Sequence, residues 1–225
     1  MSLLSKFYET SPYEGFDPSD YPSDLQGWGS DDPIFRDLIA AIRPKVIVEV
    51  GTWKGASAIH MAGITKELGL DTTIICVDTW LGSPEHFLAQ QPGWRESLLL
   101  QNGFPRLYYT FLSNVIRAGF TDRIIPLANT SDNAAVILGS VGIKADLVYI
   151  DAAHEEEPAY RDFQNYWRLL SDDGVLLGDD YISWDGVTKA ANRFAVDVQC
   201  PIVGKWSKFV ISRNPAVRPS IAFGA

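Results

Sequence analysis

The sequence predicts a doubly wound α/β fold, in which helices cover both faces of a mostly parallel β-sheet, and three observations support this prediction. Strand-like and helix-like segments alternate from about residue 34 to the C-terminus. The early strand-like segments, such as 73–77 and 146–150, are almost continuously apolar, which is typical of parallel strands buried on both faces. An earlier strand-like segment, at 45–50, is followed by a tight turn at Gly51 and then by a helix. Open α/β sheets bind ligands at turns of this kind.

The expected elements follow one another in a regular order. After a short helix near 3–8, Asp31-Asp32-Pro33 is a helix start, with Pro33 in the first turn and Ile34, Leu38 and Ile39 on an apolar face. Strands are expected at 45–50, 73–78, 123–128, 145–151, 174–179, 198–203 and 207–212. Further helices are expected at 55–68, 106–118, 131–139, 156–170 and 184–196.

The chain divides into one main domain and several appended segments. Residues 1–33 are rich in Pro, Ser, Asp, Tyr and Trp and are expected to be irregular, serving as a lid or a dimer contact. The domain covers 34–213, and a tail follows at 214–225. An insertion at 82–105 is much longer than the usual connection in α/β proteins and leaves the carboxyl end of a strand, so we expect a lid over the ligand site.

Composition excludes several classes of protein. The 225 residues carry a formal net charge of −9, which argues against nucleic acid or an anionic membrane as partner. No apolar run approaches the roughly 20 residues of a membrane span, and the first residues do not form a secretory signal. The two cysteines form no disulfide framework. A cytoplasmic location is therefore expected, and exposed aromatic residues in 1–33 could serve a homodimer.

The turn after the first strand reads Glu49-x-Gly51-x-x-x-Gly55, which differs from the Gly-x-Gly-x-x-Gly of a pyrophosphate-binding turn. Glycine allows a sharp turn and a close approach to a ligand, and the following helix offers free N–H groups. An acidic residue before the first glycine suits a cationic ligand. We expect Glu49, Gly51, Thr52, Gly55 and Ser57 to hold it.

Two further strand ends extend this binding site. Asp78 ends the second strand, a little over 20 residues after the turn, and its carboxylate suits ribose hydroxyls; Thr79 and Trp80 follow it. After the third strand, Ser131 or Asp132 is the expected N-cap of the next helix.

The fourth and fifth strands end in acidic residues. Asp151 and the pair Asp179 and Asp180 should meet at one rim of the sheet, because these strands are expected to be neighbours. Carboxylates held this close repel one another unless they are protonated or share a cation. An oxygen-only cluster suits Mg²⁺, with Mn²⁺ as second choice. The metal would orient a hydroxyl group and lower its pKa.

His154 lies three residues after Asp151, where the next helix begins. A histidine titrates near neutrality and can accept the proton of an attacking hydroxyl, so His154 is the expected general base. His86 in the insertion is the competing candidate. Four tryptophans could form the wall around the hydroxyl-bearing molecule: Trp28, Trp80, Trp94 and Trp184.

Residues 34–212 resemble the class I S-adenosylmethionine (SAM) dependent O-methyltransferases, and are most similar to the macrocin and mycinamicin type that methylates antibiotic sugars. Five segments carry the resemblance: Glu49-x-Gly51, Val77-Asp78-Thr79-Trp80, Asp151-x-x-His154, Gly178-Asp179-Asp180-Tyr181 and Trp184-Asp185-Gly186-Val187-x-x-Ala190.

The resemblance implies a seven-stranded sheet whose last strand is antiparallel, with SAM as methyl donor and a small-molecule hydroxyl, of a sugar, phenol or diol, as acceptor. It implies that Asp151, Asp179 and Asp180 hold Mg²⁺, that Asp151 also takes part in SAM binding and catalysis, and that His154 is the base. It also brings Thr130 and Ser131, in the loop after the third strand, close to the adenine of SAM.

Two other functions remain open on the same fold. A metal-dependent hydroxylase of the cephalosporin hydroxylase type would need iron on two histidines and one carboxylate, and the three histidines of this chain are widely spaced. A SAM-binding protein without catalysis would leave the acidic residues solvated. A dinucleotide dehydrogenase fits the glycine spacing least.

Overall fold

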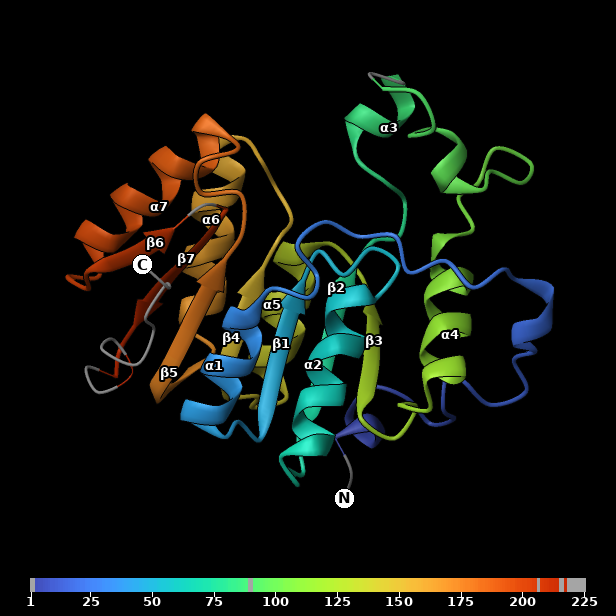
Figure 1. Ribbon diagram of the computed structural model, residues 1–225, viewed down its shortest axis with the longest axis horizontal. Helices are drawn as coiled ribbons and strands as arrows, with labels where there is room; N and C mark the ends of the chain where they lie inside the picture. Colours follow the sequence, from blue (N-terminus) through green and yellow to red (C-terminus); the bar gives the residue numbers. More distant parts are fainter. Residues whose placement is uncertain (1–2, 89–90, 206, 215–216, 218–225) are drawn as a thin grey trace.

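The computed structural model describes residues 3–88, 91–205, 207–214 and 217, and it contains the predicted doubly wound sheet. The strand order is β3-β2-β1-β4-β5-β7-β6 (Figure 1). The strands are β1 Val46–Val50, β2 Thr73–Asp78, β3 Ile124–Ala128, β4 Ala145–Ile150, β5 Leu170–Gly178, β6 Ile202–Lys205 and β7 Lys208–Ser212. The first five strands pair in parallel, and β7 runs antiparallel to both β5 and β6. The expected mostly parallel sheet with an antiparallel last strand is confirmed.

Helices cover both faces of this sheet. They are α1 Pro33–Ile42, α2 Ala56–Glu67, α3 Pro84–Leu88, α4 Leu107–Ala118, α5 Ser131–Ser140, α6 Glu156–Trp167 and α7 Asp185–Asp197. Helices α1, α2 and α4 share one core with side chains such as Ile47, whereas α5, α6 and α7 share the other with the next residue, Val48. Successive strand residues thus serve opposite faces. No helix in the described part of the chain is both long and apolar enough to cross a membrane.

Three expected boundaries differ from the structure by more than two residues. The helix expected to reach residue 170 ends at Trp167, and β5 already begins at Leu170, which pairs with Ala145. Leu169 and Leu170 are both buried, and a short buried apolar run suits a helix and a strand equally. The sequence pattern therefore could not separate the two elements at this boundary. The strand expected at 198–203 begins only at Ile202, because Gln199 has a positive φ of 54° and Pro201 has no N–H to donate.

Outside the main sheet, the structure is less regular. The helix expected near 3–8 is a short 3₁₀ turn, η1 Leu4–Lys6, and a second 3₁₀ turn, η2, covers Pro18–Asp20. The insertion contains α3 and a third 3₁₀ turn, η3 Glu96–Leu98. Figure 1 shows α3 beyond the carboxyl ends of the parallel strands, standing apart from the sheet.

The N-terminal segment is fastened along the edge strand β3. The hydroxyl of Tyr8 donates to the Pro126 carbonyl oxygen at 2.8 Å, and that of Tyr13 donates to the Ile124 carbonyl oxygen at 3.0 Å. These contacts cover an edge that would otherwise be open to pairing with another strand. The segment then crosses the carboxyl ends of β1 and β2 before α1 begins (Figure 1).

Candidate functional site

The turn after β1 depends on Gly51, whose φ is 86°. A Cβ atom at this position would lie 1.8 Å from the Asp151 carbonyl oxygen, so the loop after β4 approaches too closely for any other residue. Gly55 also has a φ of 86° and precedes α2. Glycine at position 51 therefore allows both the turn itself and the close contact between the loops after β1 and β4.

Glu49 lies inside the protein beneath this turn, with no exposed surface. Its carboxylate accepts hydrogen bonds from the hydroxyls of Ser57 and of Thr52, the latter at 3.1 Å, and contacts Cys76 Sγ at 3.5 Å. Burial raises the pKa of Glu49 to about 7, although these hydrogen bonds oppose the shift. Among the residues expected to hold a ligand, Glu49, Thr52 and Ser57 thus hold one another and do not line the cavity described below.

Asp78, at the end of β2, organises the same turn from the other side. Its Oδ2 accepts from the Trp53 N–H at 2.8 Å, and its Oδ1 accepts from the Trp80 N–H at 2.7 Å. Asp78 and Thr79 line the cavity, whereas Trp80 is buried and donates its indole N–H to the Trp53 carbonyl oxygen at 2.7 Å. Trp80 therefore supports the turn from behind, and is not part of the cavity wall.

The loop after β3 differs from expectation in its helix cap. Thr130 is the N-cap of α5, and its Oγ1 accepts from the Asn133 N–H at 3.3 Å; neither Ser131 nor Asp132 has this role. Ser131 instead lines the cavity and donates its hydroxyl to Asp162 of α6. Burial raises the pKa of Asp162 to about 6. Asp162 was missed from the sequence because it lies among the residues of an ordinary amphipathic helix.

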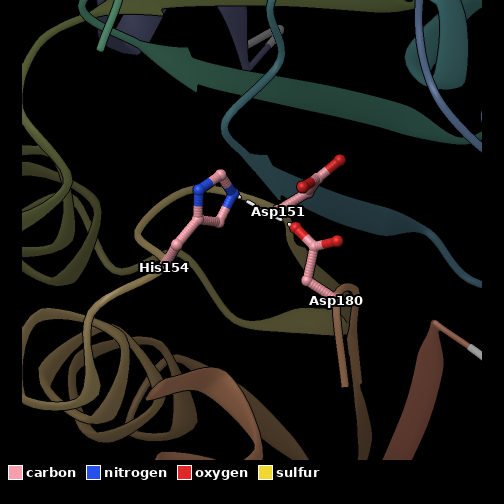
Figure 2. Close-up of side chains that lie close together, drawn as sticks. All are labelled: Asp151, His154 and Asp180. Atoms are coloured by element: carbon pink, nitrogen blue, oxygen red, sulfur yellow. Dashed lines mark ion pairs between the residues drawn. The ribbon is translucent and has the colours of Figure 1, made fainter. Parts of the chain in front are cut away.

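The strand ends of β4 and β5 bring together Asp151, His154 and Asp180 (Figure 2). One possible ligand atom from each residue lies within 4.8 Å of the others, and His154 Nε2 is 3.1 Å from Asp180 Oδ2. The His154 ring also stacks on Trp184, with centroids 4.4 Å apart. Burial lowers the pKa of His154, but the hydrogen bond and charge of Asp180 and the charges of Asp151 and Glu85 outweigh it, so the pKa is raised.

Asp179 lies beside this group, but it is not one of its three residues and has other partners. Its Oδ2 pairs with the ammonium of Lys208, and the Tyr149 hydroxyl lies 2.9 Å from the same oxygen. Its Oδ1 accepts the Asp180 N–H at 2.8 Å. The three aspartates expected to share a metal thus meet at one rim, but a lysine already neutralises one of them. Sequence reasoning missed Lys208, although a lysine at the start of the apolar strand 208–212 was the available signal.

Asp151 retains much of the repulsion expected of the acidic rim. Removal from water and the nearby charges of Asp179 and Asp180 raise its pKa to about 8, although Lys208 and His154 oppose the shift. A carboxyl group with such a pKa holds its proton at neutral pH unless another cation approaches. The rim can therefore still attract a cation at Asp151.

These strand ends border one cavity of about 740 Å³. Four tryptophans line it: Trp28, Trp53, Trp94 and Trp184. Trp28 comes from the N-terminal segment and Trp94 from the insertion, where His86 stacks between Trp53 and Trp94 with centroid distances of 4.6 and 5.6 Å. The two segments without recognisable motifs therefore build much of the wall. Trp53 was not among the expected wall residues.

Known proteins resemble this chain in sequence and in fold. The sequence profile of the methyltransferase domain family matches residues 48–181, more than half of the chain. O-methyltransferase hkm8 of Aspergillus hancockii is 33% identical over 146 residues, which cover 64% of this chain and 46% of that protein. The chain spans less than two thirds of the length of the first curated relatives that it matches.

Solved structures share the fold at low sequence identity. An O-methyltransferase from Bacillus cereus in complex with SAH superposes with a TM-score of 0.55 at 16% identity, covering 86% of this chain and 84% of that one. TomG from Streptomyces achromogenes, an O-methyltransferase involved in tomaymycin synthesis and solved with SAM, gives 0.55 at 16% identity, covering 86% and 83%.

The sheet order, the glycine turn after β1 and the cavity at the strand ends define a class I methyltransferase fold. The chain belongs to the methyltransferase domain family. The resemblance to SAM-dependent methyltransferases of this class is thereby confirmed for the family and the fold.

Proposed function

We propose that this chain transfers a methyl group from SAM to a hydroxyl oxygen of a small molecule. The observation that carries the proposal is that the glycine turn after β1 and the group Asp151, His154 and Asp180 border the same cavity. The related sequence of an O-methyltransferase supports oxygen as the acceptor atom. In this proposal the binding site for the donor and the groups that would activate the hydroxyl lie next to each other.

The donor would lie along the carboxyl ends of β1, β2 and β3. The cavity is lined there by Gly51, Asp78, Thr79 and Ser131. Gly51 has no side chain, and at this residue the loop after β1 lies directly against the Asp151 carbonyl oxygen. When bound, SAM supplies an electrophilic methyl group on a sulfonium. In this proposal Glu49, Thr52 and Ser57 contribute by keeping the turn in shape.

His154 would act as the general base. Because its Nε2 faces Asp180, the ring has Nδ1 left to accept the proton of the acceptor hydroxyl. Asp180 would fix the orientation of the ring and stabilise its protonated form, and the stacked Trp184 would limit its rotation. Asp151 lies beside both and would orient the hydroxyl.

The residues at this rim also fit a divalent cation, in a set that differs from the one expected. Two carboxylates and one imidazole can offer ligand atoms, whereas Asp179 is paired with Lys208. A nitrogen ligand suits Mn²⁺ better than Mg²⁺, which prefers oxygen. A bound cation would supply Lewis acidity at the acceptor oxygen. If His154 ligates it, the proton must go to another base, so metal and histidine base are alternatives that experiment must separate.

The hydroxylase alternative has less support. A facial triad requires two histidines and one carboxylate, whereas the described residues group one histidine with two carboxylates. His86, the other histidine at the cavity, stacks between Trp53 and Trp94 and has Ser83 Oγ 2.7 Å from its Nδ1. No observation favours a SAM-binding protein without catalysis.

Calorimetric titration of SAM into EDTA-treated protein, repeated with Mg²⁺ and with Mn²⁺, tests the proposal. We expect micromolar SAM binding without metal, and methyl transfer to a vicinal diol in a coupled assay for SAH. Transfer that needs added metal would assign the rim to a metal; transfer in EDTA would assign it to His154. Absence of SAM binding would refute the proposal.

A further inference from the structure

A buried carboxylate borders the cavity at a distance from the acidic rim. Asp162 of α6 is only 6% exposed, and it lines the cavity together with Ser131, the first residue of α5. The Ser131 hydroxyl donates to Asp162 Oδ1, and the Tyr166 hydroxyl donates to the Ser131 carbonyl oxygen at 3.0 Å. These contacts hold Ser131 and Asp162 in one arrangement, although neither takes part in the chemistry proposed for the rim.

The corner formed by Ser131 and Asp162 offers hydrogen-bond acceptors to the cavity. The Ser131 hydroxyl gives its one proton to Asp162, so its oxygen can only accept from a further partner. The Asp162 carboxylate has about four acceptor sites. Among the described residues, the Ser131 hydroxyl is the one hydrogen-bond donor that reaches it. Burial raises the pKa of Asp162 to about 6, which is still below neutrality, so at neutral pH the group accepts and does not donate. A ligand with N–H groups therefore suits this corner better than one with a carbonyl oxygen.

The corner lies at the end of the cavity that the base of SAM would reach. In the order β3-β2-β1-β4, the end of β3, which Ser131 follows, is three strands away from the end of β4, which Asp151 follows (Figure 1). Neighbouring strands are about 4.8 Å apart, so the two ends are on the order of 14 Å apart. A donor with its methyl group near His154 and its ribose at Asp78 of β2 would therefore extend its base toward Ser131.

We propose that Asp162, together with Ser131, recognises the 6-amino group of the adenine of SAM and discriminates against 6-oxo purines. This inference rests on the proposed function and assigns a specificity residue for its donor. The amino group has two N–H donors for the acceptors of this corner. The oxygen of a 6-oxo purine would face the carboxylate and leave it without a second donor, which costs free energy in a buried position.

A purely structural role for Asp162 leads to a different expectation. The same two helices are also joined through Asp132 of α5, whose carboxylate binds Arg161 at 3.3 Å and Asn165 at 2.8 Å. Asp132 is exposed and does not line the cavity. Loss of a link between α5 and α6 would lower stability and weaken all ligands alike, whereas loss of recognition would change the ratio of two ligand affinities.

The test is calorimetry with SAH and with S-inosylhomocysteine, which carries an oxygen in place of the 6-amino group of SAH. We expect the parent protein to bind SAH about tenfold more tightly or better, which corresponds to about 1.4 kcal/mol. Asp162→Asn keeps the size of the side chain and adds an N–H donor that suits the 6-oxo group, so the preference should fall to about threefold or less. Asp132→Asn is the matched control and should keep the preference. Thermal unfolding of each variant measures the structural contribution separately.

The outcomes distinguish the inference from the proposed function. Equal affinity of the parent for the two ligands, an unchanged preference in Asp162→Asn, or an equal loss of preference in Asp132→Asn would overturn the inference alone. If Asp162→Asn does not fold, Ser131→Ala decides in its place, since it removes one of the two acceptors and should lower the preference about threefold; an unchanged preference there would overturn the inference. Failure of the parent to bind either SAH or SAM would instead refute the proposed function.

Discussion

Lys208 and Asp179 form an ion pair inside the protein, directly behind the acidic rim of the cavity. The lysine side chain is 2% exposed and that of the aspartate 7%. Lys208 Nζ also lies 3.2 Å from the Tyr149 hydroxyl and above the rings of Phe35 and Tyr149. Strand β7, the last strand along the chain, thus supplies the cation that neutralises one of three neighbouring aspartates.

Replacing Lys208 by methionine should destabilise the protein by about 3–5 kcal/mol, because it leaves Asp179 buried without its counter-ion. Chemical denaturation at neutral pH measures this change in the free energy of unfolding. Lys189→Met is the control, since Lys189 pairs with Asp185 on an exposed helix surface, and such pairs contribute little. The double variant Lys208→Met with Asp179→Asn should recover much of the loss. A single Lys208→Met variant as stable as the parent would contradict this account.

Substitution of Gly51 by alanine should destroy the turn after β1. The new Cβ would overlap the Asp151 carbonyl oxygen, and the positive φ adds strain. We therefore expect the free energy of unfolding to fall by about 2 kcal/mol or more, and SAM binding to be lost. Thermal unfolding and calorimetry measure the two effects. Gly63→Ala, in α2 with open space around its Cβ position, should instead be neutral or stabilising. Normal SAM affinity in Gly51→Ala would show that the turn can move aside.

The buried carboxyl of Glu49 should make stability depend on pH. Its pKa rises from 4.5 to about 7 on folding, so between these values the folded protein keeps a proton that the unfolded chain has lost. The free energy of unfolding should therefore fall as the pH rises through this window, by an amount on the order of 3 kcal/mol from this residue. Denaturation of Glu49→Gln at pH 5 and pH 8 should show a correspondingly smaller fall. Identical pH dependence in the two proteins would place the carboxyl in a better solvated environment.

Removal of the proposed base, as in His154→Ala, should lower the turnover number by about 10²-fold or more while SAM affinity stays within about tenfold. The histidine lies at the ends of β4 and β5, away from the turn that would hold SAM. Asp180→Asn should reduce the rate less and lower the pH at which the remaining activity appears, because it removes the main interaction that raises the pKa of His154. An unchanged turnover number in His154→Ala would remove the base from the proposal.

Much of the fold could be predicted because the strands are strongly apolar and the turns carry clear signals. The strand 73–78 was predicted with its observed bounds, since its residues suit burial on both faces and no other element. The boundary at 168–170 could not be predicted, because it depends on a pairing of Leu170 with Ala145 across the sheet. The local sequence pattern thus predicts a strongly apolar strand well, but it does not predict which strands pair in the sheet.

The candidate site was predictable in part for a similar reason. Asp151, His154 and Asp180 follow strands whose order in the sheet could be anticipated, so their meeting could be expected. The pairing of Asp179 with Lys208 could not, because Asp179 follows β5 and Lys208 begins β7, and only the antiparallel return of the chain brings them together. Trp28, Trp94 and Trp184 were expected at the wall and do line the cavity. The stacking of His86 between Trp53 and Trp94 depends on an insertion without periodicity, and only the structure shows it.

The cavity is bordered by residues from Trp28 to Ser207, so its wall draws on nearly the whole described length of the chain. A partly folded molecule, lacking either the N-terminal segment or the final pair of strands, would have no complete pocket. Ligand affinity is therefore a property of the fully native state alone, and any bound ligand would shift the folding equilibrium of the entire domain. Truncation on either side of the cavity, through Trp28 or after β5, should therefore remove ligand affinity along with part of the wall.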